Sequence, residues 1–440
     1  MDILIPDNVE KIIEELELYG YEAYIVGGCV RDSLLGRAPK DYDIATSATP
    51  EQVKECLSTY KVIDTGLKHG TVTVLSDDYV EVTTFRMDSA YSDHRHPDEV
   101  TFSDNLLDDL SRRDFTVNAM AYNHRTGVID KFGGQKDLFK RKIKCVGEPA
   151  VRFNEDALRI LRALRFASQL DFEIDDLTAT AVHDMYRLLG EVSKERIASE
   201  LNGIVTGKAP CEVLKRFSDV LSFIIPEIRP CIGFEQHSRY HVYNVWDHTA
   251  AAVEHSAPET EVRLALLLHD IAKPVCCNFD DEGNGHFYGH EKEGAEMAEA
   301  ILRRLKYPND TIETVCKLIK FHYITPVDDN VVVKQLLSAV GSEDFFRLAE
   351  VIKGDSRAKQ RICFERVQIV ENMELRAKDI LDKKECISIS QLDINGADVA
   401  ALGARGRQIG DILNKLLALV IEEKADNIKS ELLKFAKGML

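Results

Sequence analysis

Hydrophobic and polar positions alternate as in strands in the first third of the chain and follow a helical period in the rest. Strands are predicted at about residues 23–26, 41–46, 61–64, 71–75 and 80–85, with helices at about 8–19 and 50–57. After about residue 145 the helical period dominates, with glycine- and proline-containing breaks. The pattern therefore predicts an α+β chain, with a small mixed β-sheet at the N-terminus followed by all-α domains.

Length and charge narrow the class of protein. A chain of 440 residues is too long for one hydrophobic core, so two to four domains are expected. The net charge of −18 argues against non-specific nucleic-acid binding by the whole surface. Residues 135–165 nevertheless carry nine basic and four acidic side chains. This local excess suits a phosphate-bearing substrate, although an ordinary solvated helix face has the same composition.

The sequence also predicts the compartment. No apolar run approaches the length of a membrane span, and the N-terminus lacks the basic start and apolar core of a signal peptide. The ten cysteines are scattered, without a Cys-x-x-Cys pair. We therefore expect a cytoplasmic protein with reduced thiols and no membrane partner.

The most informative motif is the acidic pair Asp41 and Asp43. Two carboxylates two residues apart on a strand point to the same face of the sheet, and such oxygen ligands suit Mg²⁺. Upstream, the glycine pair Gly27-Gly28 lets the backbone approach a phosphate before a predicted helix at 30–35. The combination is typical of phosphoryl or nucleotidyl transfer, whereas an isolated acidic pair could equally be an Asx turn.

Further polar groups follow along the same third of the chain. Glu81, on a later predicted strand, is either a third metal-binding carboxylate or a solvent-facing side chain. Arg112 and Arg113 precede a predicted helix that Asp114 would cap, and their planar guanidiniums suit phosphates.

A polar stripe is predicted on a helix in the basic segment. Asp156, Arg159 and Arg162 are spaced three apart, which would place one acceptor and two donor groups on one helix face. An intrahelical ladder of ion pairs is the alternative interpretation.

Together these residues resemble the class II tRNA nucleotidyltransferases, which comprise CCA-adding enzymes and their poly(A) polymerase relatives. The shared motifs, in family order across about residues 22–170, are Gly-Gly-x-Val-Arg-Asp, Asp-x-Asp, Arg-Arg-Asp-x-x-x-Asn-Ala, Asp-x-x-Gly-Gly and Glu-Asp-x-x-Arg-x-x-Arg. The resemblance implies that the 3′-terminal CCA is added to tRNA from CTP and ATP without a nucleic-acid template. An A-adding enzyme or a poly(A) polymerase is the nearest alternative.

The same resemblance implies a role for each residue. Asp41 and Asp43 would be catalytic and hold Mg²⁺, with Glu81 as a third ligand. The nucleotide would be bound by Gly28, Arg31, Arg113, Asp114, Asn118, Asp156, Arg159, Arg162 and Arg165. Within that set, Gly28 and Arg31 would contact the triphosphate, and Asp156 with Arg159 would pair with the Watson–Crick edge of CTP or ATP. The polar segment Met87 to Val100 resembles the flexible loop needed for the terminal A.

A second set of residues resembles the HD phosphohydrolase domain. The pattern His, His-Asp, His, His, Asp is matched by His248, His269, Asp270, His290, His322 and Asp355. Such ligands suit one or two transition metals (Mn²⁺, Ni²⁺, Fe²⁺ or Zn²⁺) for phosphoester hydrolysis, with Lys273 near a phosphate. A helical scaffold with a decayed site is the alternative here. For the whole chain, the rival from another class is an HD phosphohydrolase with an RNA-binding head.

These resemblances imply four domains: a nucleotidyltransferase head at 1–145, a helical RNA-binding neck at 146–230, an HD domain at 231–358 and a helical tail at 359–440. The implied partners are the tRNA 3′ end, CTP and ATP. The sequence leaves the oligomeric state open.

Overall fold

The computed structural model describes residues 3–88, 100–237 and 242–440, and the chain forms two compact units. The first unit comprises Met1–Ala209 and Arg216–Ile224, and the second comprises Pro210–Lys215 and Ile225–Leu440. Most of the polar segment predicted to be a flexible loop, residues 89–99, lies outside the described part of the chain. The finer division into four domains stays a prediction.

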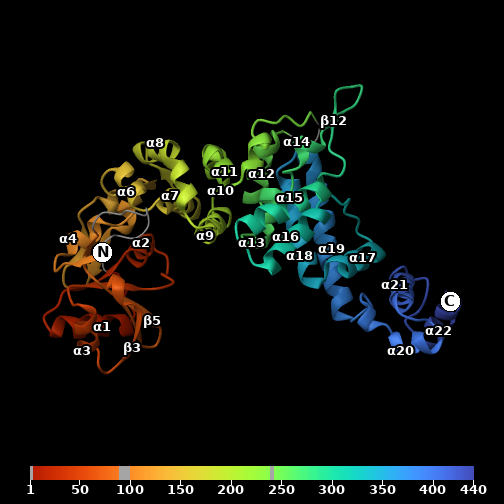
Figure 1. Cartoon of the computed structure of the whole chain (residues 1–440), viewed down its shortest axis with the longest axis horizontal. Coiled ribbons are helices and arrows are strands. Elements are labelled where there is room, and N and C mark those ends of the chain that lie inside the picture. Colours follow the sequence, from red (N-terminus) through yellow and green to blue (C-terminus); the bar gives the residue numbers. More distant parts are fainter. Residues whose placement is uncertain (1–2, 89–99, 238–241) are drawn as a thin grey trace. The chain divides into compact units, whose positions relative to one another are not determined.

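A seven-stranded mixed sheet forms the centre of the first unit (Figure 1). Its strands are β1 (Ala23–Val26), β2 (Asp43–Thr46), β3 (Lys61–Gly66), β4 (Thr71–Leu75), β5 (Tyr79–Thr84), β8 (Met120–Asn123) and β9 (Gly127–Asp130). They lie in the order β3-β4-β5-β2-β1-β8-β9, and only β2 and β5 pair in parallel within this sheet. The α+β prediction is confirmed, and β1 and β4 have the predicted bounds.

Side-chain alternation explains why these segments are strands. In β5, Val80 and Val82 are buried and Tyr79 and Glu81 are exposed, as expected for a strand with one covered face. Every residue of the interior strand β1 is buried, which matches its continuous apolar run. Two further short strands, β6 (Arg86–Asp88) and β7 (Val100–Phe102), pair with each other in antiparallel fashion.

The helices of the first unit surround the sheet and continue beyond it. They are α1 (Asp7–Leu18), α2 (Gly28–Leu34), α3 (Pro50–Cys56), α4 (Leu106–Ser111), α5 (Gly134–Phe139), α6 (Pro149–Glu155), α7 (Leu158–Leu170), α8 (Asp176–Met185), α9 (Lys194–Val205) and α11 (Ser218–Ile224). Two short strands, β10 (Lys142–Ile143) and β11 (Glu173–Ile174), pair in parallel among them. Helix α3 begins with a reciprocal capping box between Thr49 and Gln52, which satisfies two backbone donors.

Two sequence predictions about helices were wrong. The segment after Arg113 forms a single 3-10 turn, Thr116–Asn118, and Asp114 does not cap an α-helix. The predicted helix through Asp156 is broken, because α6 ends at Glu155 and Asp156 has an extended backbone with φ −138°. Asp156 therefore lies between two helices and does not share a helical stripe with Arg159 and Arg162.

The second unit is almost entirely helical, with one short hairpin of β12 (Asn278–Phe279) and β13 (Gly285–His286). Its main helices are α12 (Val245–Glu254), α13 (Thr260–Leu268), α14 (Lys273–Cys276), α15 (His290–Arg304), α16 (Asn309–Phe321), α17 (Asn330–Val340), α18 (Ser342–Arg357) and α19 (Glu365–Asp382). Helix α13 is buried from Val262 to Leu268 and packs against α12, α16 and α18. None of the described helices is both long enough and apolar enough to span a bilayer.

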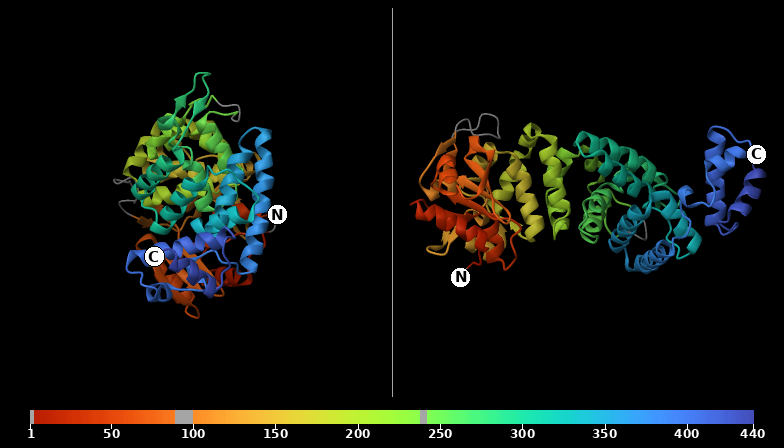
Figure 2. Two further views of the ribbon diagram at one scale, coloured as in Figure 1. Left: turned by 90° about the vertical axis from the view of Figure 1, so that its right-hand side faces the viewer. Right: turned by 90° about the horizontal axis from the view of Figure 1, so that it is seen from below.

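The last part of the chain has a core of its own. Helices α20 (Gly396–Ala401), α21 (Arg407–Ile421) and α22 (Lys429–Lys437) pack on one another, as the blue segment of Figure 2 shows. Val399, Leu416 and Leu432 are fully buried in this core.

Candidate active site and candidate metal centre

The acidic pair lies where two neighbouring strands meet a glycine turn. Asp43 is the first residue of β2 and faces Val26, the last residue of β1, so Asp43 lies at the same sheet edge as Gly27-Gly28. Asp41 precedes the strand, which corrects the prediction that both carboxylates alternate along it. The two carboxylates nevertheless line one pocket.

Glu81 lies beside Asp43 but outside the pocket lining. Asp43 pairs in register with Glu81 across the parallel strands β2 and β5. Burial by surrounding protein atoms, together with the negative charges of Asp41 and Glu81, raises the pKa of Asp43 from 3.8 to about 6, against the opposing charge of Arg113. Carboxylates whose negative charges raise the pKa of Asp43 fit a divalent cation, which would relieve the repulsion at Asp43.

The glycine turn needs its glycine. Gly27 has φ 77° and ψ −127°, a conformation that L side chains rarely adopt, and a Cβ there would come within 2.9 Å of Nη1 of Arg113. The turn leads into α2, whose Arg31 donates from Nη1 to Oδ1 of Asn118 at 2.7 Å. This contact links the glycine turn to the segment that follows Arg113.

Buried acids hold the arginines of the pocket in place. Asp109, fully buried on α4, accepts hydrogen bonds from Arg112 at 2.5 Å and from Arg113 at 3.0 Å. Asp114 accepts at 3.1 Å from Nδ2 of Asn118 and at 2.7 Å from Nε of Arg162. Burial alone would raise the pKa of Asp114, but the Arg162 guanidinium and the Asn118 hydrogen bond lower it. Sequence reasoning missed Asp109.

Asp156 and Arg159 have partners outside the predicted stripe. Oδ1 of Asp156 accepts from the backbone N–H of Leu158 at 3.0 Å, and Oδ2 accepts from Nη2 of Arg196 at 2.8 Å. Arg159 pairs with Glu155 and donates to the backbone oxygen of Arg112 at 2.9 Å. The intrahelical ladder between Asp156 and Arg159 is therefore not formed.

Helix α9 supplies two residues that sequence reasoning missed. Arg196 pairs with Asp156, and Glu200 accepts from Nε of Arg165 at 2.6 Å. The spacing of Arg196 and Glu200, four apart on one helix, was the available signal, because such residues share a helix face. Arg165 thus faces α9.

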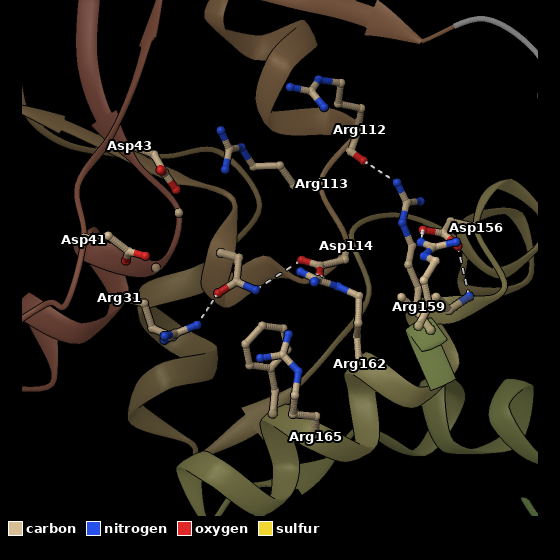
Figure 3. A pocket seen from close by; sticks show the side chains of 16 residues that line it. Arg31, Asp41, Asp43, Arg112, Arg113, Asp114, Asp156, Arg159, Arg162 and Arg165 are labelled. Carbon is tan, nitrogen blue, oxygen red and sulfur yellow. Dashed lines mark hydrogen bonds and ion pairs between the residues drawn. The ribbon is translucent and has the colours of Figure 1, made fainter. Parts of the chain in front are cut away.

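The acidic pair, the glycine turn and the arginines meet in one pocket of about 540 Å³ (Figure 3). In Figure 3, Asp41 and Asp43 lie on one side of the pocket, and Asp156 with Arg159 lies on the other. The lining contains seven arginines and four aspartates, with Gly27, Gly28, Asn118, Leu158 and Phe166. The pocket therefore combines a carboxylate pair for a cation with a strongly basic wall for an anion.

A second constellation lies within the second unit. His248 is on α12, His269-Asp270 follows α13, His290 begins α15, His322 follows α16 and Asp355 is on α18. All six are buried. The structure forms two groups of potential metal ligands that share Asp270: one with His248 and His269, and one with His290 and His322.

The distances divide the two oxygens of Asp270 between these groups. Oδ2 lies 3.1 Å from Nε2 of His269 and 3.5 Å from Nε2 of His248. Oδ1 lies 3.6 Å from Nε2 of His290 and 4.0 Å from Nε2 of His322. Asp355, the most distant in sequence, places Oδ1 3.0 Å from Nε2 of His248. These residues could hold one or two cations, and Asp270 would offer one oxygen to each group of ligands.

The imidazoles are oriented as in a metal site. Nδ1 of His269, His290 and His322 lies within 2.7 Å of the backbone oxygens of Leu266, Phe287 and Ile319, respectively. Such contacts leave Nε2 to face the cluster. Among the described residues, Nε2 of His269 and Oδ2 of Asp270 are buried and lie 3.1 Å apart without the geometry of a hydrogen bond, and Lys273 pairs with the same oxygen of Asp270 at 2.7 Å. Both atoms are of the kinds that bind transition metals.

Burial also favours the metal-binding form of three histidines. It lowers the pKa of His248, His290 and His322, so these imidazoles stay neutral at pH 7, as metal binding requires. Burial opposes the protonation of His269 as well, but the charges of Asp270 and Asp355 raise its pKa. Lys273 and Lys359 lie 2.7 Å and 2.6 Å from oxygens of Asp270 and Asp355, where they balance the acids.

Fold and sites together define a chain with a head domain of the poly A polymerase type joined to an HD domain. Residues 23–144 match the model of the poly A polymerase head domain, and residues 171–231 match that of the probable RNA and SrmB-binding site of polymerase A. Residues 239–353 match the HD domain.

Comparison with the sequences of known proteins identifies the family within this class. The CCA-adding enzyme of Enterococcus faecalis is 33% identical over 429 residues, 97% of this chain and 94% of that protein. The chain belongs to the CCA-adding enzyme family. Two Lactobacillus delbrueckii CCA-adding enzymes are 52% identical over 207 residues, and the matched stretch spans about half of their length (52%).

Solved structures show the same fold. A Bacillus stearothermophilus CCA-adding enzyme in complex with CTP superposes with a TM-score of 0.74 at 28% identity, covering 99% of this chain and 98% of that one. A Thermotoga maritima CCA-adding enzyme complexed with tRNA has a TM-score of 0.58 at 20% identity, covering 99% and 96%, which is a likeness of fold alone.

Proposed function

We propose that this protein adds the 3′-terminal CCA to tRNA from CTP and ATP, without a nucleic-acid template. The observation that carries the proposal is the single pocket that holds Asp41 and Asp43 at one side and Asp156 with Arg159 at the other. A nucleoside triphosphate has the same two ends, a phosphate chain that needs cations and a base that needs selective hydrogen bonds. Family membership supports the same activity.

Asp41 and Asp43, with Glu81 beside Asp43, would hold Mg²⁺, which when bound supplies activation of the 3′-hydroxyl and charge neutralisation at the phosphates. The oxygen of the 3′-hydroxyl attacks the α-phosphorus, and the bond from that phosphorus to the bridging oxygen breaks. Pyrophosphate leaves, and the hydroxyl proton passes to solvent. Arg31 and Arg113 lie beside the glycine turn, where their guanidiniums can donate to the phosphate oxygens.

Base selection would rest on Asp156 and Arg159. A carboxylate only accepts hydrogen bonds, and a guanidinium only donates them. Cytosine and adenine each present an exocyclic amine next to a ring nitrogen that accepts, so this pair suits both. Uracil and guanine present an oxygen and an N–H at the corresponding places, so the same pair rejects them.

The test uses tRNAs that end before CCA, after C and after CC, each with CTP, ATP or both. We expect C, C and A to be added in order, with products resolved by size. Addition of A alone, and only to the CC-ended tRNA, would instead identify an A-adding enzyme. Repeated addition of A to every primer would identify a poly(A) polymerase. The loop segment 87–100, which favours CCA or A addition over CC addition, lies mostly outside the described residues.

A second activity is supported by the cluster in the second unit. We propose that His248, His269, Asp270, His290, His322 and Asp355 hold one or two transition metals and that the unit hydrolyses phosphomonoesters or 2′,3′-cyclic phosphates. The burial of all six side chains and the position of Asp270 in both groups of potential ligands support this. Assays with Mn²⁺, Ni²⁺, Fe²⁺ or Zn²⁺ on these substrates test the proposal, and hydrolysis that His269→Ala leaves unchanged contradicts it.

The substrates also bear on the compartment. A protein that uses tRNA, CTP and ATP would work in the cytoplasm, and the ten free cysteines fit a reducing environment.

A further inference from the structure

One aromatic ring lies among three arginines of the pocket. The Cζ atom of Arg165 lies 4.4 Å from the ring centroid of Phe166, and those of Arg31 and Arg162 each lie 5.3 Å from it. A guanidinium within about 6 Å of a ring centroid is attracted by the negative face of the ring. Phe166 therefore contacts three cations, which come from two different helices, α2 and α7.

The ring itself is held firmly. Phe166 is 6% exposed, and Phe115, fully buried, packs its ring edge-to-face against it with centroids 5.8 Å apart. Among the described residues that line the pocket, Phe166 is the one aromatic side chain. It thus forms a fixed, apolar centre in an otherwise charged wall.

Each of the three guanidiniums also has a carboxylate partner. Arg31 pairs with Asp32 at 2.9 Å, Arg162 with Asp114 at 2.6 Å and Arg165 with Glu200 at 2.6 Å. These ion pairs fix the direction of each guanidinium. Because a guanidinium carries five N–H donors, donors remain on each arginine for the oxygens of a ligand. Three oriented guanidiniums around one ring make a site for a polyanion.

We propose that Phe166 is a positioning residue that holds Arg31, Arg162 and Arg165 together as the subsite for the triphosphate of the incoming nucleotide. The inference rests on the proposed function and names the part of the substrate that this wall binds. Three neighbouring cations repel one another, and the ring offsets this repulsion through its π-electrons. An aliphatic side chain would fill the space without this attraction, so the electronic character of the ring is the testable feature.

The decisive variant replaces Phe166 by a fluorinated phenylalanine, which keeps the shape of the ring and weakens its negative face. Phe166→Leu removes the ring, whereas Phe166→Tyr keeps an aromatic ring at this position. The readouts are the binding of inorganic tripolyphosphate, measured directly by calorimetry, and KM and kcat for CTP and ATP. For Phe166→Leu we expect the Kd for tripolyphosphate and the KM for each nucleotide to rise by about tenfold. A tenfold change is about 1.4 kcal/mol, within the range for desolvated cation–π contacts. The fluorinated variant should have a tripolyphosphate affinity between those of Phe166→Leu and the wild type. Phe166→Tyr should bind tripolyphosphate as the wild type does.

A matched control is available in the same unit. Phe217 is 2% exposed and has Cζ of Arg216 5.4 Å from its ring centroid, but it does not line the pocket. Phe217→Leu should therefore leave tripolyphosphate binding unchanged, although it removes a buried phenylalanine in the same way. This separates a local effect from a general loss of packing.

Unchanged tripolyphosphate binding in the fluorinated variant overturns the inference. If a Phe166 variant changes the preference between CTP and UTP but keeps its tripolyphosphate affinity, the inference is also overturned. Such a result would mean that the base of the nucleotide, and not its triphosphate, lies against the ring. If Phe166→Leu fails to fold, the isosteric fluorinated variant still decides. Failure of the wild type to extend tRNA would reject the proposed function, whereas tripolyphosphate binding by the variants tests Phe166 independently of that activity.

Discussion

Arg196 donates a hydrogen bond from Nη2 to Oδ2 of Asp156 at 2.8 Å, while the backbone N–H of Leu158 donates to Oδ1 at 3.0 Å. A carboxylate offers about four lone-pair sites, two on each oxygen. One site on each oxygen is therefore left to accept the amine of a base. The two protein donors fix the plane of the carboxylate, and this plane decides where that amine must lie.

We predict that Arg196→Ala relaxes base selection. Asp156 would keep its backbone contact but lose a charge-assisted bond, and such bonds contribute about 1.5–3 kcal/mol when buried. Arg196 is a quarter exposed, so we expect the smaller end of this range, a roughly tenfold loss in the preference for CTP over UTP. The measurement is kcat/KM for each nucleotide on a tRNA ending before CCA, and Arg196→Lys should recover part of the preference.

Lys194 provides the control on the same helix. It is an exposed cation two residues before Arg196, and it does not line the pocket. Lys194→Ala should leave the ratio of CTP to UTP use unchanged. Equal effects of both substitutions would mean that α9 acts through general charge and not through Asp156.

Removal of either proposed metal-binding aspartate should abolish nucleotide addition. We expect Asp41→Ala and Asp43→Asn each to reduce kcat/KM for CTP and ATP by at least about a hundredfold, because the metal-assisted charge stabilisation is lost. Hydrolysis by the second unit should continue at the wild-type rate. Extension of tRNA and hydrolysis of a phosphomonoester, assayed on the same preparations, separate these outcomes from misfolding.

The Mg²⁺ requirement of tRNA extension should depend on pH through Asp43. Its pKa is raised from 3.8 to about 6, so below about pH 6 protons compete with the metal, and above about pH 7 they do not. The half-saturating Mg²⁺ concentration should thus rise as pH falls through about 6. Glu81→Gln removes one of the charges that raise the pKa of Asp43. In this variant the half-saturating Mg²⁺ concentration should therefore begin to rise at a lower pH than in the wild type.

The nucleotide also titrates near neutral pH, but it does so equally in both enzymes. The comparison between wild type and Glu81→Gln therefore isolates the protein carboxylates. Identical midpoints in the two enzymes would contradict the effect of Glu81 on Asp43.

Metal loading should stabilise the second unit and depend on His269. The buried ligands come from α12, α15 and α18 and from the ends of α13 and α16, so a cation that binds only the folded state raises the free energy of unfolding. We expect Mn²⁺ or Ni²⁺ to raise the Tm by several degrees and a chelator to reverse the change. His269→Ala should lose bound metal, measured by elemental analysis, and keep tRNA extension. Full metal content in this variant would exclude His269 as a ligand.

Local sequence patterns determined much of the first unit. A short apolar run located β1 and side-chain alternation located β4 at their observed bounds, because apolar runs, side-chain period and turn residues are local properties. The turn at Gly27-Gly28 was foreseeable for the same reason, since a glycine pair after a buried strand permits a backbone that other residues avoid.

Tertiary structure decided which groups meet. The sequence pattern placed Asp41 on a strand and Asp156 on a helix, and both are outside those elements because pairing and packing override local propensity. Arg196 and Glu200 share a helix face that their spacing indicates, but the residues of α7 and of the segment before it that they contact are fixed only by packing. Asp109 was missed although it lies three and four residues before the arginines that it pairs with. The six residues from His248 to Asp355 could be named from their order, but only the packing of their helices makes Asp270 common to both groups. A sequence records which side chains are available, and long-range packing fixes the distances on which their chemistry depends.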